Sequence, residues 1–415
     1  LDTWFSSATW TFSTLGWPKQ TSDLKTFHST PWIQMGYEIV YLWMMRMILM
    51  STYALDQIPF RQVYIHGILR NEEGKKFSKS SGDNIDPLEI IQKFGCDALR
   101  WSVLIGSAPG NDSRFYQEKV EGARNLVNKL WNISRYLITT IVSDETAAST
   151  TETFADRWIQ TRLQEVVASV TKKMELSQFS AAGEELRDFT WSDLADWYLE
   201  IAKVEKGKSK ILKEILQTIL KLWHPFMPFV TEAIWQQAGF EGMLIVASWP
   251  EQGVVSTSVR ETASFELLRT FVTDARRLRA EQCVEPAKQI AFGCSVPPGL
   301  REFVQNNEAW IKRLMNASSL EYLETLPSGW ASAVTGSFAI GFDPLGVLDL
   351  GKEKEKIQKE LAEAQQYIKN LEGKLANQEF VSKAPVHVTD GMKAKLAEAQ
   401  AKEKMLMERL QKLGI

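Results

Sequence analysis

The segments Gln62-Val63-Tyr64-Ile65-His66-Gly67-Ile68-Leu69 and Gly74-Lys75-Lys76-Phe77-Ser78-Lys79-Ser80-Ser81-Gly82 decide the fold of the first part of the chain. The first is rich in β-branched and aromatic residues and predicts a strand. The second follows the end of that strand and precedes residues 85–91, where Asp86-Pro87 indicates the start of a helix. Ammonium, hydroxyl and backbone N–H groups between glycines suit a polyphosphate. We therefore predict a phosphate-binding loop, although a lysine-serine loop considered alone is more often a solvated turn.

This loop is not a Walker P-loop, because the glycine that precedes Lys-Ser in that motif is replaced by Ser78. Strand-like and helical segments alternate from residue 1 to about 108, which predicts an α/β layer with a parallel sheet. Ligands of such sheets bind beyond the carboxyl ends of the strands, where the lysine loop also lies. Residues 38–52 carry apolar side chains on nearly every face and predict a buried helix.

Short motifs along the chain resemble the class I aminoacyl-tRNA synthetases and, among them, the valyl-tRNA synthetase family. Residues 76–80 are similar to the KMSKS signature, with Phe77 in place of methionine. The other matching motifs are LDTWFSS at 1–7, FSTLGWP at 12–18, GYEI at 36–39, VYIHG at 63–67, CDALR at 96–100 and DWYLE at 196–200. The resemblance covers nearly the whole chain.

The resemblance implies an enzyme, a valine–tRNA ligase, that joins valine to ATP and then transfers the valyl group to valine tRNA. ATP would be a substrate and Mg²⁺ its counter-ion, held mostly through phosphates and water rather than by protein ligands. Lys76 and Lys79 are the expected catalytic residues, because they would clamp the pyrophosphate. Ser78 and Ser80 would bind the nucleotide with them.

The resemblance also places an adenosine site at Gly36 and Glu38. A carboxylate can accept both ribose hydroxyls, and glycine permits close approach of the backbone. His66 and Gly67 lead into the nucleotide loop and are expected to bind the nucleotide, with an ordinary strand-end role as the alternative for His66.

Trp4, Ile39 and Trp43 match positions that wall the valine pocket in the family. Ile39 and Trp43 are spaced to share a helix face, and plain core packing is the alternative interpretation. Such a pocket excludes isoleucine but discriminates against threonine only by ~10², so family members carry an editing domain.

The sequence predicts five segments. Residues 1–110 would be the C-terminal part of a Rossmann-like catalytic domain, residues 111–153 a connecting helix and linker, and residues 154–260 a helical bundle that the resemblance assigns to the anticodon. Residues 261–348 would form a small α/β junction module, and residues 349–415 a coiled-coil arm. The bundle cations could contact RNA or form a solvated face; they are Arg157, Arg162, Lys172, Lys173 and Arg187. The large aromatic residues of the bundle are predicted to be core residues: Trp191, Trp197, Tyr198 and Trp223.

The tail has a heptad seam that predicts two helices in an antiparallel hairpin. The seam residues before Pro385 are Ile357, Leu361, Ala364, Ile368, Leu371 and Leu375. In the family such an arm touches tRNA, here through Lys369, Lys374 and Lys383; a dimerisation element is the alternative. The resemblance implies a monomeric complete enzyme.

Composition sets the remaining limits. The net charge is −3. The 3 cysteines lack metal-site spacing, so we expect a cytoplasmic protein without a structural metal. We also expect no membrane span. The sequence contains no HIGH-like motif and no trace of the editing domain. We therefore interpret the chain as the C-terminal portion of such an enzyme, inactive alone. The alternatives are a non-catalytic tRNA-binding module with a vestigial nucleotide loop, or a structural coiled-coil partner.

Overall fold

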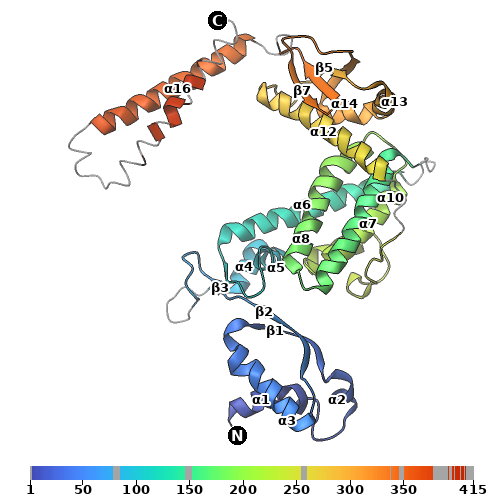
Figure 1. Cartoon of the computed structure of the whole chain (residues 1–415), viewed down its shortest axis with the longest axis vertical. Coiled ribbons are helices and arrows are strands. Elements are labelled where there is room, and N and C mark those ends of the chain that lie inside the picture. Colours follow the sequence, from blue (N-terminus) through green and yellow to red (C-terminus); the bar gives the residue numbers. More distant parts are fainter. Residues whose placement is uncertain are drawn as a thin grey trace. The chain divides into compact units, whose positions relative to one another are not determined.

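The computed structural model describes residues 2–77, 85–144, 152–253, 259–336, 338–344 and 350–376, together with 391, 395–396, 398–401, 403–405 and 407. The chain forms two compact units, residues 1–265 and 266–415. Figure 1 shows both units.

The first unit begins with a small α/β layer. Helices α1 (Thr3–Ser13), α2 (Ser22–Phe27) and α3 (Met45–Leu55) accompany strands β1 (Thr30–Gly36) and β2 (Phe60–His66) (Figure 1). The two strands pair in parallel, with Thr30 opposite Phe60 and Gly36 opposite His66. A parallel pair needs a long crossover, which the helical segment between the strands provides. The predicted parallel arrangement is confirmed.

The prediction of one buried helix over residues 38–52 is wrong. This segment comprises a 3₁₀ turn η1 (Tyr37–Ile39), a π-helical turn η2 (Val40–Met44) and α3. Its side chains include Tyr41 at 78% and Leu49 at 61% exposure. The segment itself carries apolar side chains on nearly every face, but the core beneath it is small. Only one of its faces packs on that core, which consists of Met35, Met47 and Phe60.

The lysine-loop region follows β2. The predicted strand ends at His66, and β3 (Leu69–Arg70) instead pairs in parallel with β4 (Ser113–Arg114). Helix α4 (Pro87–Phe94) begins as expected, because the Asp86 side chain accepts a hydrogen bond from the Leu88 N–H at 2.8 Å. Helix α5 (Cys96–Leu104) comes next.

A helical bundle completes the first unit. It contains α6 (Gln117–Asp144), α7 (Phe154–Glu175), α8 (Phe179–Asp188), the π-helical η3 (Phe189–Tyr198), α9 (Leu199–Ala202), α10 (Ser209–Trp223), α11 (Pro228–Gln237) and the 3₁₀ turn η4 (Leu244–Val246). Gly207 lies between α9 and α10, Pro225 lies between α10 and α11, and Pro228 is the first residue of α11. Trp197, Tyr198 and Trp223 are buried, as predicted, but Trp191 is 39% exposed. Trp191 is therefore not a core residue; the Lys129 ammonium lies 4.3 Å from its ring centroid.

Helix α5 ties the lysine-loop region to this bundle. The buried Asp97 carboxylate accepts hydrogen bonds from the N–H groups of Val230 (2.7 Å) and Phe229 (3.3 Å) at the start of α11. The Arg100 guanidinium donates to the carbonyl oxygen of Pro225 at 2.9 Å. Trp101 packs edge-on against Trp223, with ring centroids 5.2 Å apart. These contacts fix the segment that follows the loop to the corner between α10 and α11.

The second unit contains most of α12 (Val259–Glu281), followed by β5 (Ile290–Ser295), α13 (Pro298–Asn306), α14 (Glu308–Met315), β6 (Ala317–Tyr322), β7 (Ala331–Thr335) and β8 (Phe338–Phe342). The sheet order is β6-β5-β8-β7, with β5 and β6 parallel and the other pairs antiparallel. Buried Arg279 donates to the carbonyl oxygens of Lys288 and Asn316 and so joins α12 to the chain around β5 and β6. Helix α16 (Leu350–Ala376) lies in the tail.

Candidate functional site

The carboxyl ends of β1 and β2 bring together the residues expected at the nucleotide. Gly36 ends β1 and is paired with His66, the last residue of β2. Glu38 and Gly67 follow within two residues along the chain. The expected position at the ends of parallel strands is thus where these residues lie.

Gly36 is tightly coupled to Glu38. A Cβ atom at residue 36 would lie 2.2 Å from the Glu38 carboxylate oxygen Oε2. Any other residue at position 36 would push this carboxylate away. The glycine therefore leaves room for an acidic group at the strand end.

The next strand end is equally close-packed. A Cβ atom at Gly67 would lie 1.8 Å from the carbonyl oxygen of Asn111, so only glycine fits here. His66 holds its Nδ1 atom 2.6 Å from the carbonyl oxygen of Gly67. His66 is therefore fixed locally, at the turn that leads into β3.

The lysine loop begins as a tight turn after β3. The Gly74 N–H donates to the carbonyl oxygen of Asn71 at 2.9 Å, and Gly74 has a φ of 82°. The Asn71 side chain accepts from the Lys75 N–H at 2.7 Å. Lys76 then forms an antiparallel bridge with Arg70. The backbone of Lys76 is consequently fixed to β3.

The two adjacent lysines of this turn differ in charge environment. The Lys75 ammonium forms an ion pair with Glu73 at 2.6 Å. The Lys76 side chain is exposed, and within the described part of the chain no carboxylate pairs with it. Lys76 is therefore the lysine that is available to an anion. Ser78, Lys79 and Ser80 lie outside the described residues.

Asp112 joins these segments, and sequence reasoning missed it. Its Oδ1 atom accepts from the Ile68 N–H at 2.7 Å, while Oδ2 accepts from the Arg70 guanidinium and from the Tyr37 hydroxyl, the latter at 3.3 Å. The bond from Ile68 and then the one from Arg70 lower the pKa of the Asp112 carboxyl. Gly110-Asn111-Asp112 is typical of a turn, but no local signal identifies partners so distant in sequence.

The three residues expected at the valine pocket lie around α1 and the turns before α3. Ile39 and Trp43 are half-buried against the Met35 cluster, and the Trp43 indole N–H donates to the Ser7 carbonyl oxygen at 3.3 Å. Trp4 is 60% exposed, and the Arg46 guanidinium carbon lies 2.9 Å from its ring centroid. Trp43 and Ile39 thus share one cluster, whereas Trp4 stacks with a cation.

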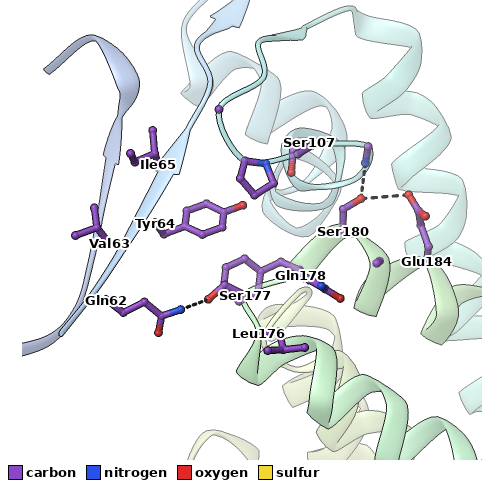
Figure 2. A pocket seen from close by; sticks show the side chains of 16 residues that line it. Gln62, Val63, Tyr64, Ile65, Ser107, Leu176, Ser177, Gln178, Ser180 and Glu184 are labelled. Atoms are coloured by element: carbon purple, nitrogen blue, oxygen red, sulfur yellow. Dashed lines mark hydrogen bonds between the residues drawn. The ribbon is translucent and has the colours of Figure 1, made fainter. Parts of the chain in front are cut away.

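A large open cavity lies elsewhere in the first unit. Its volume is about 930 Å³, and it lies between β2, residues 106–110 and the start of α8 (Figure 2). Tyr64 and Phe179 form its aromatic side, and Ser180 donates to Glu184 at 3.1 Å. No lysine or arginine lines it. The cavity therefore does not suit a polyphosphate.

Most of the bundle cations named above already have anionic partners. Arg162 pairs with Asp193 and Glu165, Lys173 with Glu185, and Arg187 with Asp188. Arg157 donates to the Glu152 carbonyl oxygen at 3.2 Å. Exposed Lys172 stands apart, because the described residues give it no such partner. The positive charge of this group is therefore largely neutralised within the bundle.

The described part of the tail shows two facing segments. Ala364, Ile368 and Leu371 of α16 are buried, as is Ala399. Gln365 donates to Glu403 at 2.9 Å, and Gln400 donates to Glu372 at 3.4 Å. The partner of the later residue in α16 comes earlier in the second segment, which is the order of antiparallel helices. Lys369 is exposed, the Lys374 side chain is not among those described, and Lys383 lies outside the described residues.

The described residues contain no group of three or more His, Cys, Asp or Glu side chains placed to hold a metal ion. Their helices include none with the length and apolar character that a bilayer crossing requires. The cysteines at positions 96, 283 and 294 are all free thiols.

Comparison with known protein families finds three matches along the chain. Residues 1–116 match the class I tRNA synthetases (I, L, M and V), residues 156–293 match the anticodon-binding domain of tRNA ligase, and residues 349–414 match the valyl tRNA synthetase tRNA binding arm.

Curated relatives agree over the full length of the chain. The valine–tRNA ligase of Enterococcus faecalis is 38% identical over 100% of this chain and 49% of its own length. That of Bacillus cereus (strain ATCC 10987) is 38% identical over 99% of this chain and 48% of its own. The chain thus spans about half the length of these relatives.

A solved structure shows the fold. The ternary complex of Agrobacterium radiobacter K84 LeuRS with tRNA and LeuAMS superposes with a TM-score of 0.54 at 20% identity, covering 63% of this chain and 33% of the other.

Proposed function

We propose that this chain, which belongs to the valyl-tRNA synthetase family of class I aminoacyl-tRNA synthetases, forms part of an enzyme that activates valine with ATP and transfers it to valine tRNA. In the first step the valine carboxylate attacks the α-phosphorus of ATP, and pyrophosphate leaves. In the second step a hydroxyl of the terminal tRNA adenosine attacks the valyl carbonyl carbon, and AMP leaves. The observation that carries the proposal is the similarity of this whole chain to about half the length of valine–tRNA ligases, together with Lys76, which has no carboxylate partner among the described residues.

The nucleotide would lie across the ends of β1 and β2. The Glu38 carboxylate is placed beside Gly36 and would accept the ribose hydroxyls, and His66 and Gly67 would border the nucleotide from the adjacent strand. Lys76 would bind the leaving pyrophosphate, together with Lys79, Ser78 and Ser80. Charge on the phosphates grows as the bond breaks, so an ammonium at this place favours the transition state.

Magnesium would supply counter-charge to the triphosphate when bound. Mg²⁺ keeps several waters and uses phosphate oxygens as ligands in sites of this kind. The described residues offer no cluster of protein ligands, so we assign none. The residues of this chain that meet the same phosphates would be the loop lysines.

The valine side chain would bind near Trp43 and Ile39. Both side chains are half-buried, so each has a face toward the core and a face that remains available. A rigid aromatic wall limits the size of the side chain that can enter. Trp4, on the neighbouring α1, would complete the pocket.

Valine-dependent exchange of pyrophosphate into ATP tests this function. The measurement uses the natural polypeptide that contains this chain together with whatever further residues the gene encodes. Exchange should require valine and be weak with isoleucine. When Trp43 is replaced by alanine, isoleucine should also support exchange. Binding of valine tRNA without any amino-acid-dependent exchange would instead support the non-catalytic tRNA-binding module.

The bundle and the tail would bind the tRNA. We propose that α16 and the described residues between 395 and 405 belong to an antiparallel coiled-coil hairpin, which the Gln365–Glu403 and Gln400–Glu372 contacts support. A helix of 27 residues extends about 40 Å at 1.5 Å per residue. Such an arm is long enough to contact a large ligand such as tRNA. Exposed lysines such as Lys369 would meet phosphates.

Deletion of residues 350–415 should weaken tRNA binding while leaving valine activation nearly unchanged. Because the lost contacts are to phosphates, the difference should shrink as salt is added. Filter binding at several salt concentrations, with light scattering on the same protein, measures both quantities. An unchanged tRNA dissociation constant at low salt, accompanied by the loss of a dimer, would favour a dimerisation element.

A further inference from the structure

We infer that Asp112 is a positioning residue for adenylate formation, because it fixes the turn that carries Lys76 against the segment that follows β1. Within the described residues, the side-chain partners of Asp112 do not include Lys76. Asp112 acts through Arg70 and Tyr37. The inference rests on the proposed function, since it assigns Asp112 a role in the same reaction.

Asp112 receives donors from three separate segments. The Ile68 N–H comes from the turn after β2, the Arg70 guanidinium from β3, and the Tyr37 hydroxyl from η1. Tyr37 lies between Gly36 and Glu38, the residues proposed for the ribose. A single carboxylate therefore links the ribose side of the site to the strand that leads into the lysine turn.

Arg70 extends this link to the turn itself. Its backbone bridges to Lys76, and its guanidinium donates to the carbonyl oxygen of Gly74 at 3.4 Å. The side chain thus holds Asp112 at one end and the lysine turn at the other. A shift of Arg70 would move the backbone from which the Lys76 ammonium projects.

The close approach at Gly67 keeps Asp112 in place. The Asn111 carbonyl oxygen lies where a Cβ of residue 67 would be, so the chain segment 111–112 packs directly on the turn after β2. Ser113 and Arg114 then pair with β3. The backbone on both sides of Asp112 is therefore held, and its carboxylate has a fixed direction.

Small displacements matter for a group that acts on the transition state. A misplacement of about 1 Å can cost about 10² in rate, because the interaction must be made at the moment when charge develops. Asp112 and Arg70 are partly exposed, with side-chain exposures of 23% and 32%. Surface pairs of this kind contribute little to stability. Loss of this pair should therefore be visible in the rate rather than in folding.

The test is Asp112→Asn in the natural polypeptide, measured by pyrophosphate exchange and by thermal unfolding. The asparagine oxygen can still accept from the Ile68 N–H, but its NH₂ group cannot accept from Arg70 or Tyr37. We expect kcat to fall about 10- to 100-fold, with the KM for valine nearly unchanged. The unfolding midpoint should move by no more than about 2–4 °C.

A matched control is Glu185→Gln. Glu185 also accepts from a hydroxyl, that of Ser169 at 2.6 Å, and from a cation, Lys173, and this pair has side-chain exposures of 26% and 29%. Neutralising it should leave exchange unchanged. Tyr37→Phe removes only the hydroxyl contact and should reduce kcat less than Asp112→Asn does.

The possible outcomes distinguish the proposed function from the positioning role of Asp112. If the unchanged protein shows no valine-dependent exchange, the proposed function fails. If it does, and Asp112→Asn retains kcat within about twofold, the positioning role is overturned. A fall in kcat that Glu185→Gln reproduces, or that comes with an unfolding midpoint lowered by more than about 4 °C, would show a general structural effect and would also overturn it.

Discussion

Replacement of Lys76 by alanine should slow pyrophosphate exchange by ~10²–10³ while changing the KM for valine little. The expected loss is that of one preorganised charge aimed at a developing anion. Pyrophosphate becomes more negative on the bridging side as its bond to the α-phosphorus breaks. An interaction that strengthens in the transition state raises kcat rather than lowering KM.

The structure distinguishes Lys76 from its neighbour. Lys75 is paired with Glu73 at 2.6 Å, and this pair lowers the pKa of the Glu73 carboxyl through the hydrogen bond from Lys75. Lys76 has no such partner within the described residues, and its backbone is held by the bridge to Arg70. Of these two lysines, Lys76 is the one that offers an uncompensated ammonium on a fixed backbone.

Lys75→Ala is therefore the matched control for Lys76→Ala. It removes a lysine from the same turn but leaves the unpaired cation in place, so exchange should change by less than about threefold, as for a surface ion pair worth under about 1 kcal/mol. Equal losses in both variants would show that the loop responds only to total charge. A raised KM for valine with an unchanged kcat would remove Lys76 from the transition state.

Replacement of Lys208 by alanine should strongly destabilise the protein. We expect it to lower the free energy of unfolding by about 3–5 kcal/mol. Lys208 is only 2% exposed. Its ammonium lies 2.5 Å from the Asp156 carboxylate and 2.8 Å from that of Glu205. Without the ammonium, two carboxylates would remain close together in a buried site.

Other hydrogen-bond donors to these carboxylates are uncharged groups of Tyr198 and Thr153. The Tyr198 hydroxyl donates to Asp156 at 2.7 Å, and burial followed by the Asp156 charge raises the pKa of Tyr198, which therefore stays a donor. Asp156 also closes the capping box of α7 with Thr153. The Lys208→Ala substitution would consequently destabilise the start of α7 as well as that of α10.

Urea unfolding of Lys208→Ala and of Lys210→Ala measures this contribution. Lys210 is exposed and two residues further along α10, so its replacement should change the free energy by less than about 0.5 kcal/mol. Adding Asp156→Asn to Lys208→Ala should restore part of the loss, because it removes one of the stranded charges. A single-variant loss below about 1 kcal/mol would show that water reaches the site.

Local sequence signals determined the bounds of several elements. Asp86-Pro87 gives the start of α4, the glycine and proline breaks divide the bundle, and β-branched residues mark β2 up to His66. The parallel pairing of β1 and β2 follows from the crossover between them, and it brings Gly36 and His66 together. The element bounds depend on neighbouring residues and the parallel pairing on chain connectivity, which is why the sequence predicts both. The five-segment division and the roles of the site residues remain predictions.

Tertiary contacts decided the rest. Sequence pattern cannot show that Lys75 is neutralised and Lys76 is not, because both are lysines in one turn. It also cannot place Asp112 beside Tyr37 and Arg70, since those partners lie 75 and 42 residues away. Trp191 was expected in the core but is 39% exposed, because the face of η3 that carries Phe189, Leu194 and Trp197 is the one that packs inward. Tyr41 in η2 is likewise exposed, at 78%. Periodicity gives the faces of a helix, but long-range packing selects the buried face and the charge partners.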